Sequence, residues 1–269
     1  MGLAFGDYGS CGVECTGPAR DIERRQSAFD AQRTLTTAQS VLIVGGGAVG
    51  VELCGELANK KCILATTELV PDLPVKDKVL RSLQSRGVQV HFARARRLSE
   101  HTYDVGGEEI EVDACLWCFG GRPQTAFLPS DLLDDRGFVA IDPYRRSLKF
   151  PQMYACGDVA SKSDGQRLAS YAHIEGEYVA HHILASLRGR EISPYSPPPR
   201  FVALSLGPRD GCFVYDSIAF PMPGFLVPWL KGLIEAWFIR LLPMPYALLS
   251  LLPGDVTART WSKRPRTVS

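Results

Sequence analysis

Residues 41–58, VLIVGGGAVGVELCGELA, decide the fold of this chain. Four apolar, β-forming side chains run directly into three glycines, and a helical pattern follows. Gly45, Gly47 and Gly50 match the spacing G-x-G-x-x-G where a buried strand meets a helix. Such a turn either binds a dinucleotide phosphate or only lets a strand turn sharply into a helix. The βαβ pattern around it favours the first interpretation.

Each glycine of the motif meets a separate physical demand. Gly45 permits the tight turn, Gly47 lets the main chain approach a diphosphate, and Gly50 lets the helix pack closely on the strand. Amide groups at the helix N-terminus then face the phosphate charge. We expect the main chain of the whole turn to bind the cofactor, namely Gly45, Gly46, Gly47, Ala48, Val49 and Gly50.

The end of the second strand bears on which dinucleotide binds. An acidic side chain about 20 positions after the motif usually binds the adenine ribose hydroxyls. Here the strand ends Ala65-Thr66-Thr67-Glu68. Glu68 can bind the ribose if the strand extends slightly further than expected. Otherwise Thr66 and Thr67 offer neutral hydroxyls, which carry no charge that would repel the 2′-phosphate of NADPH. NADH and NADPH both stay open.

Strands and helices alternate around this turn. We expect a helix over 22–38, strands at 41–44, 62–66 and 88–92, and helices at 49–57 and 76–85 between them. This β-α-β-α-β order predicts an α/β fold with a parallel sheet and crossover helices. Further along we expect a hairpin-like pair, a strand at 114–119, a helix over 168–187, a proline-dense linker at 193–200, and two antiparallel strands around an Arg-Asp-Gly turn.

The composition is that of an ordinary globular protein. The chain has 269 residues, 45% of them hydrophobic, and its net charge of +1 gives no indication of nucleic-acid binding. Its eight cysteines are scattered, which fits a reducing intracellular location better than a disulfide framework. The start, MGLAFGDYG, matches neither a signal peptide nor a myristoylation signal. We expect a cytoplasmic protein, with peripheral binding to an intracellular membrane or mitochondrion left open.

Three motifs occur in a fixed order: GGGAVGVELCGEL, then CFGGRPQ, then PQMYACGDVAS. In this order and spacing they resemble the pyridine nucleotide–disulfide oxidoreductase superfamily of two-dinucleotide flavoproteins. The similarity is greater to its apoptosis-inducing-factor-like branch, which includes the ferroptosis suppressor quinone reductase, and it covers residues from about 40 to 211. The resemblance implies FAD and NAD(P)H as cofactors. It also implies hydride transfer from nicotinamide to flavin, and then electron transfer to a quinone-like or other small-molecule acceptor.

The resemblance also implies roles for individual residues. Glu52 matches the family's acid near the nicotinamide end and is the candidate catalytic residue, while a carboxylate that only stabilises the helix N-terminus is the alternative. Gly120 and Pro123 match the turn that returns the chain to the FAD domain. Gly157 and Asp158 match the flavin motif, in which the aspartate accepts hydrogen bonds from the ribityl or pyrophosphate region. Beside the isoalloxazine ring the family places the start of the next helix, here Arg167, Leu168 and Ala169.

One part of the family pattern is not found. The family opens with another strand–glycine–helix unit that binds the ADP half of FAD. The glycines of residues 1–12 neither follow a β-rich run nor precede a helix at the right spacing. Without that unit Asp158 would hold the flavin largely alone. We therefore expect FAD binding by this chain to be weak or lost, as in a truncated gene model or a fragment of a longer protein.

The cysteines and histidines indicate no second site. Cys115 and Cys118 form a C-x-x-C, but positions i and i+3 of a strand face opposite sides, so we expect core residues and not a redox pair. No cysteine has the further ligands of a zinc site nearby, and we expect no metal. His173 is a candidate at the flavin edge, with a solvated or core histidine as the alternative.

We divide the chain into four segments. They are a remnant of the FAD domain with a connecting helix (1–37), a Rossmann-like NAD(P)H-binding domain (38–119), the second part of the FAD-binding domain (120–192) and a small α+β module with an apolar tail (193–269). The tail either contacts a membrane or a second subunit, or covers the C-terminal sheet. The expected function is that of an FAD-dependent NAD(P)H oxidoreductase. The alternative is a flavin-poor chain that binds NAD(P)H or a partner without turnover.

Overall fold

The computed structural model describes residues 30–71, 73–118, 123–161, 167–220 and 223–241. Contacts within the chain divide it into two compact units, Met1–Pro228 and Trp229–Ser269. The four segments expected from the sequence divide the chain more finely than these units, and they stay a prediction. The helix expected before the first strand is present over residues 30–37, and its expected start at residue 22 lies outside the described residues.

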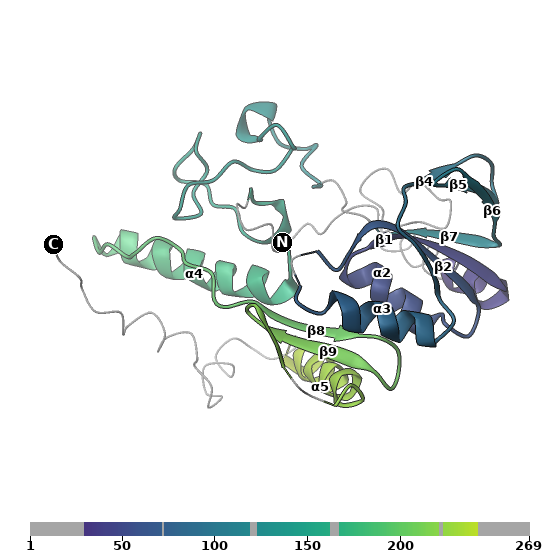
Figure 1. Ribbon diagram of the computed structural model, residues 1–269. Helices are drawn as coiled ribbons and strands as arrows, with labels where there is room; N and C mark the ends of the chain where they lie inside the picture. The colour runs from purple at the N-terminus through teal and green to yellow at the C-terminus, as the bar shows by residue number, and fades with distance from the viewer. Residues whose placement is uncertain (1–29, 72, 119–122, 162–166, 221–222, 242–269) are drawn as a thin grey trace. The chain divides into compact units, whose positions relative to one another are not determined.

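A four-stranded parallel sheet forms the centre of the first unit, in the order β3-β2-β1-β7. Its strands are β1 (Ser40–Gly46), β2 (Lys61–Leu69), β3 (Gln89–His91) and β7 (Ala114–Trp117). Helices α2 (Ala48–Glu56) and α3 (Lys76–Ser85) make the crossovers (Figure 1). The expected β-α-β-α-β order is confirmed. The glycine turn therefore follows the carboxyl end of β1, the edge at which ligands of such sheets bind.

Both faces of this sheet are covered, which explains the unbroken apolar run at 41–44. Val41 and Ile43 are fully buried on the face that carries α2 and α3. Leu42 and Val44 face the opposite way and pack against a second, antiparallel sheet. The expected hairpin-like pair is present there, and a further short strand joins it: the strands are β4 (Ala95–Arg97), β5 (Thr102–Val105) and β6 (Glu108–Glu111).

The next part of the chain is mostly irregular apart from one long helix. It contains η1 (Ser130–Leu132), η2 (Gly157–Val159) and α4 (Ala169–Leu187). The proline-dense linker has no regular structure, as expected, but it is bound to its neighbours. The Tyr178 hydroxyl of α4 donates to the carbonyl of Ser193 at 2.9 Å, and the N–H of Tyr195 donates to the carbonyl of Pro143 at 2.9 Å. The linker is thus part of the packed structure.

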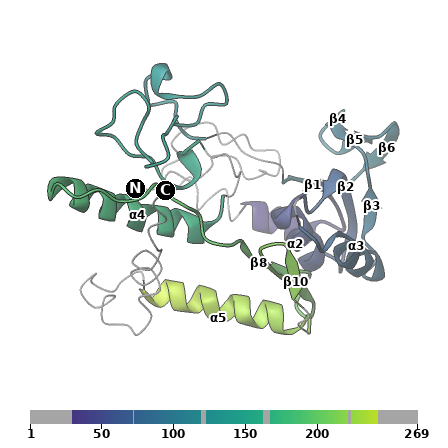
Figure 2. The ribbon, with the colours of Figure 1, turned by 60° about the vertical axis from the view of Figure 1, so that its left-hand side comes forward.

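A small antiparallel sheet follows the linker. Its strands are β8 (Phe201–Ser205), β9 (Gly211–Tyr215) and β10 (Ile218–Phe220). β8 and β9 confirm the expected pair, whereas β10 was not predicted because its three exposed residues give no alternation. β8 lies beside α2 (Figures 1 and 2). Lys78 of α3 donates to the carbonyl of Gly211 at 2.7 Å, which ties the small sheet to the helices.

Helix α5 (Leu226–Leu241) begins in the first unit and continues into the second. The helix forms the first part of the expected apolar tail (224–253), and the part after residue 241 lies outside the described residues. Within the described part of the chain, no helix combines the length and the apolar character needed to cross a membrane. The role of the tail stays a prediction.

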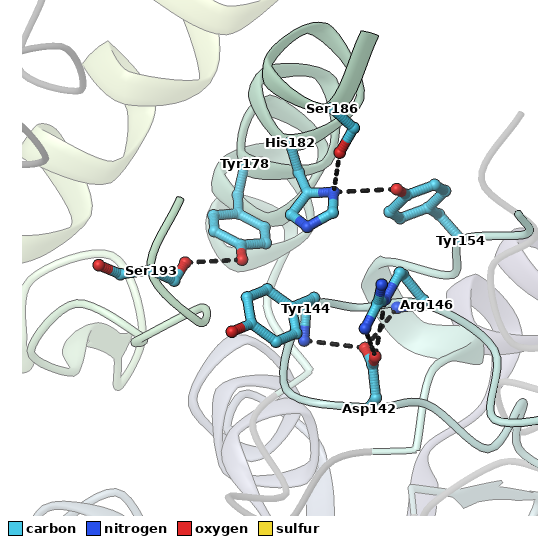
Figure 3. Close-up of polar contacts among 8 residues, drawn as sticks. All are labelled: Asp142, Tyr144, Arg146, Tyr154, Tyr178, His182, Ser186 and Ser193. Carbon is cyan, nitrogen blue, oxygen red and sulfur yellow. Dashed lines mark hydrogen bonds and ion pairs between the residues drawn. The ribbon is translucent and has the colours of Figure 1, made fainter. Parts of the chain in front are cut away.

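A buried histidine fixes the second half of α4. His182 is 8% exposed, and its Nδ1 lies 2.9 Å from the hydroxyl of Tyr154 (Figure 3). Burial lowers the pKa of His182 below its ordinary value of 6.5, the positive charge of Arg146 lowers it further, and Asp142 opposes this in part. The imidazole is packed against tyrosine rings, those of Tyr144, Tyr154 and Tyr178.

The glycine turn packs closely against its own helix and the neighbouring strand. A Cβ atom on Gly50 would collide with the carbonyl oxygen of Gly45, and one on Gly46 would lie 2.5 Å from the carbonyl oxygen of Glu68. A Cβ atom on Gly47 would meet nothing within 4 Å. Gly50 therefore sets how closely α2 approaches β1, as the motif predicts.

Gly50→Ala should destabilise the protein, because main chain occupies the place of the added methyl group. We expect a loss of about 1–3 kcal/mol, the usual cost of overpacking. Gly47→Ala is the matched control and should change the stability much less, because φ there is −71°, the space is open, and the reduced freedom of the unfolded chain offsets the poorer N-cap. Urea unfolding measures both variants. Equal midpoints would show that Gly50 does not control this packing.

The free energy of unfolding should fall as the pH is lowered from about 7 to about 5. The folded state holds His182 neutral, whereas the unfolded chain binds a proton near the ordinary pKa of 6.5, so acid favours unfolding. His182→Phe removes the titrating group and should flatten this part of the profile. Urea unfolding at a series of pH values compares the two proteins. If the free energy of unfolding changes with pH equally in the wild type and in His182→Phe, His182 is not held neutral in the folded state.

Candidate functional site

The hydroxyl of Thr66 holds the glycine turn from the end of β2. It accepts a hydrogen bond from the N–H of Gly46 at 2.9 Å and donates one to the carbonyl of Glu68 at 2.6 Å. The side chain is 6% exposed. The hydroxyl of Thr66 thus positions the turn, and direct binding of the cofactor by this residue stays a prediction.

On the side where space is open, the glycine turn exposes its main chain, and no side chain caps the start of α2. Gly45 has a φ of 117°, in the left-handed region that glycine adopts readily. Gly47 is the N-cap of α2 and makes no side-chain hydrogen bond, and the next two residues, Ala48 and Val49, are exposed. The first N–H groups of a helix have no partners within the helix. The open space at Gly47 and these N–H groups together fit a diphosphate.

Glu68 lies near the end of β2, which runs to Leu69 and is longer than expected. Thr67 and Glu68 are both exposed there. The N–H of Val70 donates to the carbonyl of Gly46 at 2.7 Å, so the end of the strand stays close to the glycine turn. The long strand meets the condition under which Glu68, and not the threonines, is expected to bind the adenine ribose.

Glu52 links α2 to the small antiparallel sheet. Its Oε1 accepts a hydrogen bond from the N–H of Ser205 in β8 at 3.1 Å, and the residue is half-buried. Residue 205 is distant in sequence, so no local pattern indicates this contact. The role of Glu52 near the nicotinamide stays a prediction. Its observed role is to bind the main chain of β8.

The Gly157–Asp158 motif forms the short turn η2. Gly157 has a φ of 74°, and a Cβ atom there would lie 3.2 Å from the Cβ of Ala172, so the turn is packed directly on α4. Asp158 is half-buried, and the described residues give its carboxylate no hydrogen bond or ion pair. A carboxylate in this position suits the hydroxyl groups of a ribityl chain. Gly120, from the preceding motif, lies outside the described residues.

Two charged residues behind this turn were not predicted from the sequence. The Oε2 atom of Glu175 accepts the N–H of Gly157 at 2.6 Å, and its Oε1 accepts a bond from Nη2 of Arg145 at 2.6 Å. Neither belongs to a motif. The available signal is a charge within the buried stripe of α4, which comprises Tyr171, Glu175, Tyr178 and His182.

The start of α4 carries the remaining predicted site residues. Leu168 is the N-cap of α4, makes no side-chain hydrogen bond as a cap, and packs against the core of the parallel sheet. Arg167 holds its guanidinium 4.2 Å from the ring centroid of Phe138. Ala169, the first helical residue, is exposed. The first N–H groups of α4 are thus free of a side-chain cap, as a role beside the flavin ring requires.

The C-x-x-C pair behaves as expected for core residues. Cys115 packs on the face of β7 turned toward the antiparallel sheet β4–β6, and Cys118 packs on the face that carries the helices. Neither cysteine forms a disulfide, and burial raises the pKa of Cys118 to about 11, which disfavours the thiolate. His173 is exposed, 3.3 Å from Glu177. No group of metal-binding side chains occurs among the described residues.

Comparisons with known proteins agree with this geometry. The model of the pyridine nucleotide-disulphide oxidoreductase family matches residues 11–176. The chain is 28% identical over 236 residues to oxidoreductase ptaL of Pestalotiopsis fici, covering 81% of this chain and 62% of that protein. It is 27% identical over 208 residues to ferroptosis suppressor protein 1 of Xenopus tropicalis, covering 68% and 55%. The water-forming NADH oxidase of Lactobacillus brevis has the same fold, with a TM-score of 0.56 at 19% identity, covering 73% and 46%.

The resemblance inferred from the motifs and the expected α/β fold are therefore confirmed. This chain spans 55–62% of the length of the two curated relatives. Members of the family are NAD(P)H-dependent flavin oxidoreductases that use FAD and NAD(P)H. Because the family model covers more than half of the residues, the chain belongs to the pyridine nucleotide-disulphide oxidoreductase family.

Proposed function

We propose that this chain forms the nicotinamide-binding part and one side of the flavin site of an NAD(P)H oxidoreductase that delivers electrons to a quinone-like acceptor. The observation that carries the proposal is the glycine turn, where the main chain is open at Gly47 and α2 begins without a side-chain cap. A diphosphate matches both features, because it needs close approach of the main chain and N–H donors.

Each half of the site has its own part in this function. When bound, the two cofactors supply direct hydride transfer, so the protein needs no acid–base pair of its own. The main chain of the glycine turn binds the diphosphate, and Glu68 accepts hydrogen bonds from the adenine ribose. Asp158 accepts hydrogen bonds from the ribityl region, and the N-terminus of α4 stabilises negative charge on the flavin ring.

The electron acceptor and the location belong to the same proposal. A quinone-like acceptor is taken from the resemblance to the ferroptosis-suppressor branch, to one member of which the chain is 27% identical over 208 residues. We further propose a cytoplasmic protein whose apolar tail, residues 224–253, contacts a membrane surface or a second subunit.

The rival function is non-enzymatic: binding of NAD(P)H or a protein partner without flavin turnover. The sequence holds one G-x-G-x-x-G motif, and it spans 55–62% of the length of two relatives. A cofactor held by Asp158 and the start of α4 alone would bind weakly. The two proposals differ in whether the purified chain retains reducible flavin.

Flavin absorbance under anaerobic conditions separates these proposals. The chain is loaded with FAD, freed of excess cofactor and titrated with NADH. Bleaching of the flavin band, followed by recovery of the band on addition of a soluble quinone, is the result expected. Protein that binds NADH but holds no flavin supports the rival. Bleached protein that a quinone does not reoxidise contradicts the proposed acceptor.

Glu68 should favour NADH over NADPH. Its carboxylate accepts hydrogen bonds from two ribose hydroxyls and repels a 2′-phosphate. Glu68→Gln should lower the ratio of NADH affinity to NADPH affinity about tenfold, which corresponds to roughly 1.4 kcal/mol. Calorimetric titration with both coenzymes measures the ratio, and Glu56→Gln, an exposed carboxylate at the end of α2, is the control. If Glu68→Gln leaves the ratio of NADH affinity to NADPH affinity unchanged, Glu68 does not contact the adenine ribose.

A further inference from the structure

A buried ion pair lies directly behind the turn that carries Asp158. Nη2 of Arg145 donates to Oε1 of Glu175 at 2.6 Å, and the two side chains are 7% and 1% exposed. The other oxygen of the same carboxylate accepts the main-chain N–H of Gly157 at 2.6 Å. A single carboxylate thus joins a loop arginine to the flavin motif.

Burial makes this arrangement costly for the protein. Taking two charges out of water costs more than their attraction returns, unless further hydrogen bonds satisfy them. Glu175 uses both oxygens, and the guanidinium of Arg145 lies 4.2 Å from the ring centroid of Tyr195. Nε of Arg145 is nevertheless buried without a hydrogen-bond partner in the described part of the chain. Stability alone gives no reason to keep such a pair, because nonpolar side chains of similar volume would serve as well.

The main chain at Arg145 also contacts the flavin motif. Arg145 has a φ of 66°, and its carbonyl accepts the N–H of Ala155, two residues before Gly157, at 3.0 Å. Side chain and main chain of Arg145 therefore reach the same segment. Gly157 is left-handed and packed on Ala172, so its N–H has little freedom, and Glu175 accepts it. The carboxylate thereby restrains the main chain immediately before Asp158.

We propose that Glu175 and Arg145 are positioning residues for the flavin, which hold the Gly157–Asp158 turn so that the Asp158 carboxylate meets the ribityl or pyrophosphate region. This inference rests on the proposed function and assigns to the same site two residues outside every motif. A purely structural pair would change the stability of the protein and leave flavin affinity unaltered. A positioning pair changes flavin affinity in variants that remain folded.

Two double variants separate these roles. Arg145→Met with Glu175→Gln removes both charges and leaves an amide oxygen that can accept the N–H of Gly157. Arg145→Met with Glu175→Leu removes both charges and the acceptor at similar volume. Neither leaves a lone buried charge, the main cause of misfolding in single variants. Glu177→Gln, on the same helix and paired with His173, is the control.

FAD is titrated into each full-length protein, and hydrogen exchange of the Gly157 amide is followed without FAD. The Met–Gln variant and Glu177→Gln should bind FAD within about threefold of the wild type. The Met–Leu variant should bind FAD at least about tenfold more weakly and exchange the Gly157 amide faster, because that N–H has lost its acceptor. Urea unfolding confirms that each protein is folded.

Equal FAD affinity in the two double variants overturns the proposal, whether or not the exchange rates differ, because the pair then has a structural role only. Absence of FAD binding by the wild type contradicts the proposed function of this chain. In that case hydrogen exchange decides the positioning role. Faster exchange in the Met–Leu variant alone supports it, and equal exchange in both double variants overturns it.

Discussion

The contact between Gly50 and the carbonyl of Gly45 is the constraint on which the rest of the structure depends. Because Gly50 has no Cβ, α2 packs directly against the main chain of Gly45, and its first N–H groups stand without a side-chain cap beside the open space at Gly47. Thr66 fixes the turn from the next strand. The sheet, buried on both faces, holds these parts together. The main-chain geometry of the turn alone therefore fits an anion.

The Gly157–Asp158 motif offers a ligand an acceptor, whereas the glycine turn offers donors. At the glycine turn, N–H donors are left for a ligand. At η2 the N–H of Gly157 is taken by Glu175, and the carboxylate of Asp158 is left as an acceptor. One part of the chain therefore suits a diphosphate, and the other suits hydroxyl groups. Leu168 at the start of α4 packs against the core of the parallel sheet, and α4 contacts η2.

The sequence predicts the features whose signals are local. The glycine spacing, the apolar run at 41–44 and the helix at 76–85 are found as expected, and the C-x-x-C lies across two faces of its strand. Contacts between distant segments have no such signal, and this is why the partners of Thr66 and Glu52 were not predicted. β4 and β10 are too short to show a period. Glu175 is an intermediate case, because a charge in a buried helical stripe is visible in the sequence but its partner is not.

The most direct test of the central claim is calorimetric titration of the folded chain with NADH, with ADP-ribose and nicotinamide mononucleotide as competitors. ADP-ribose contains the diphosphate, and the mononucleotide does not. If the glycine turn binds the diphosphate, NADH saturates a single site from which ADP-ribose, and not the mononucleotide, displaces it. A folded sample that shows no heat and no saturation with NADH would contradict the claim.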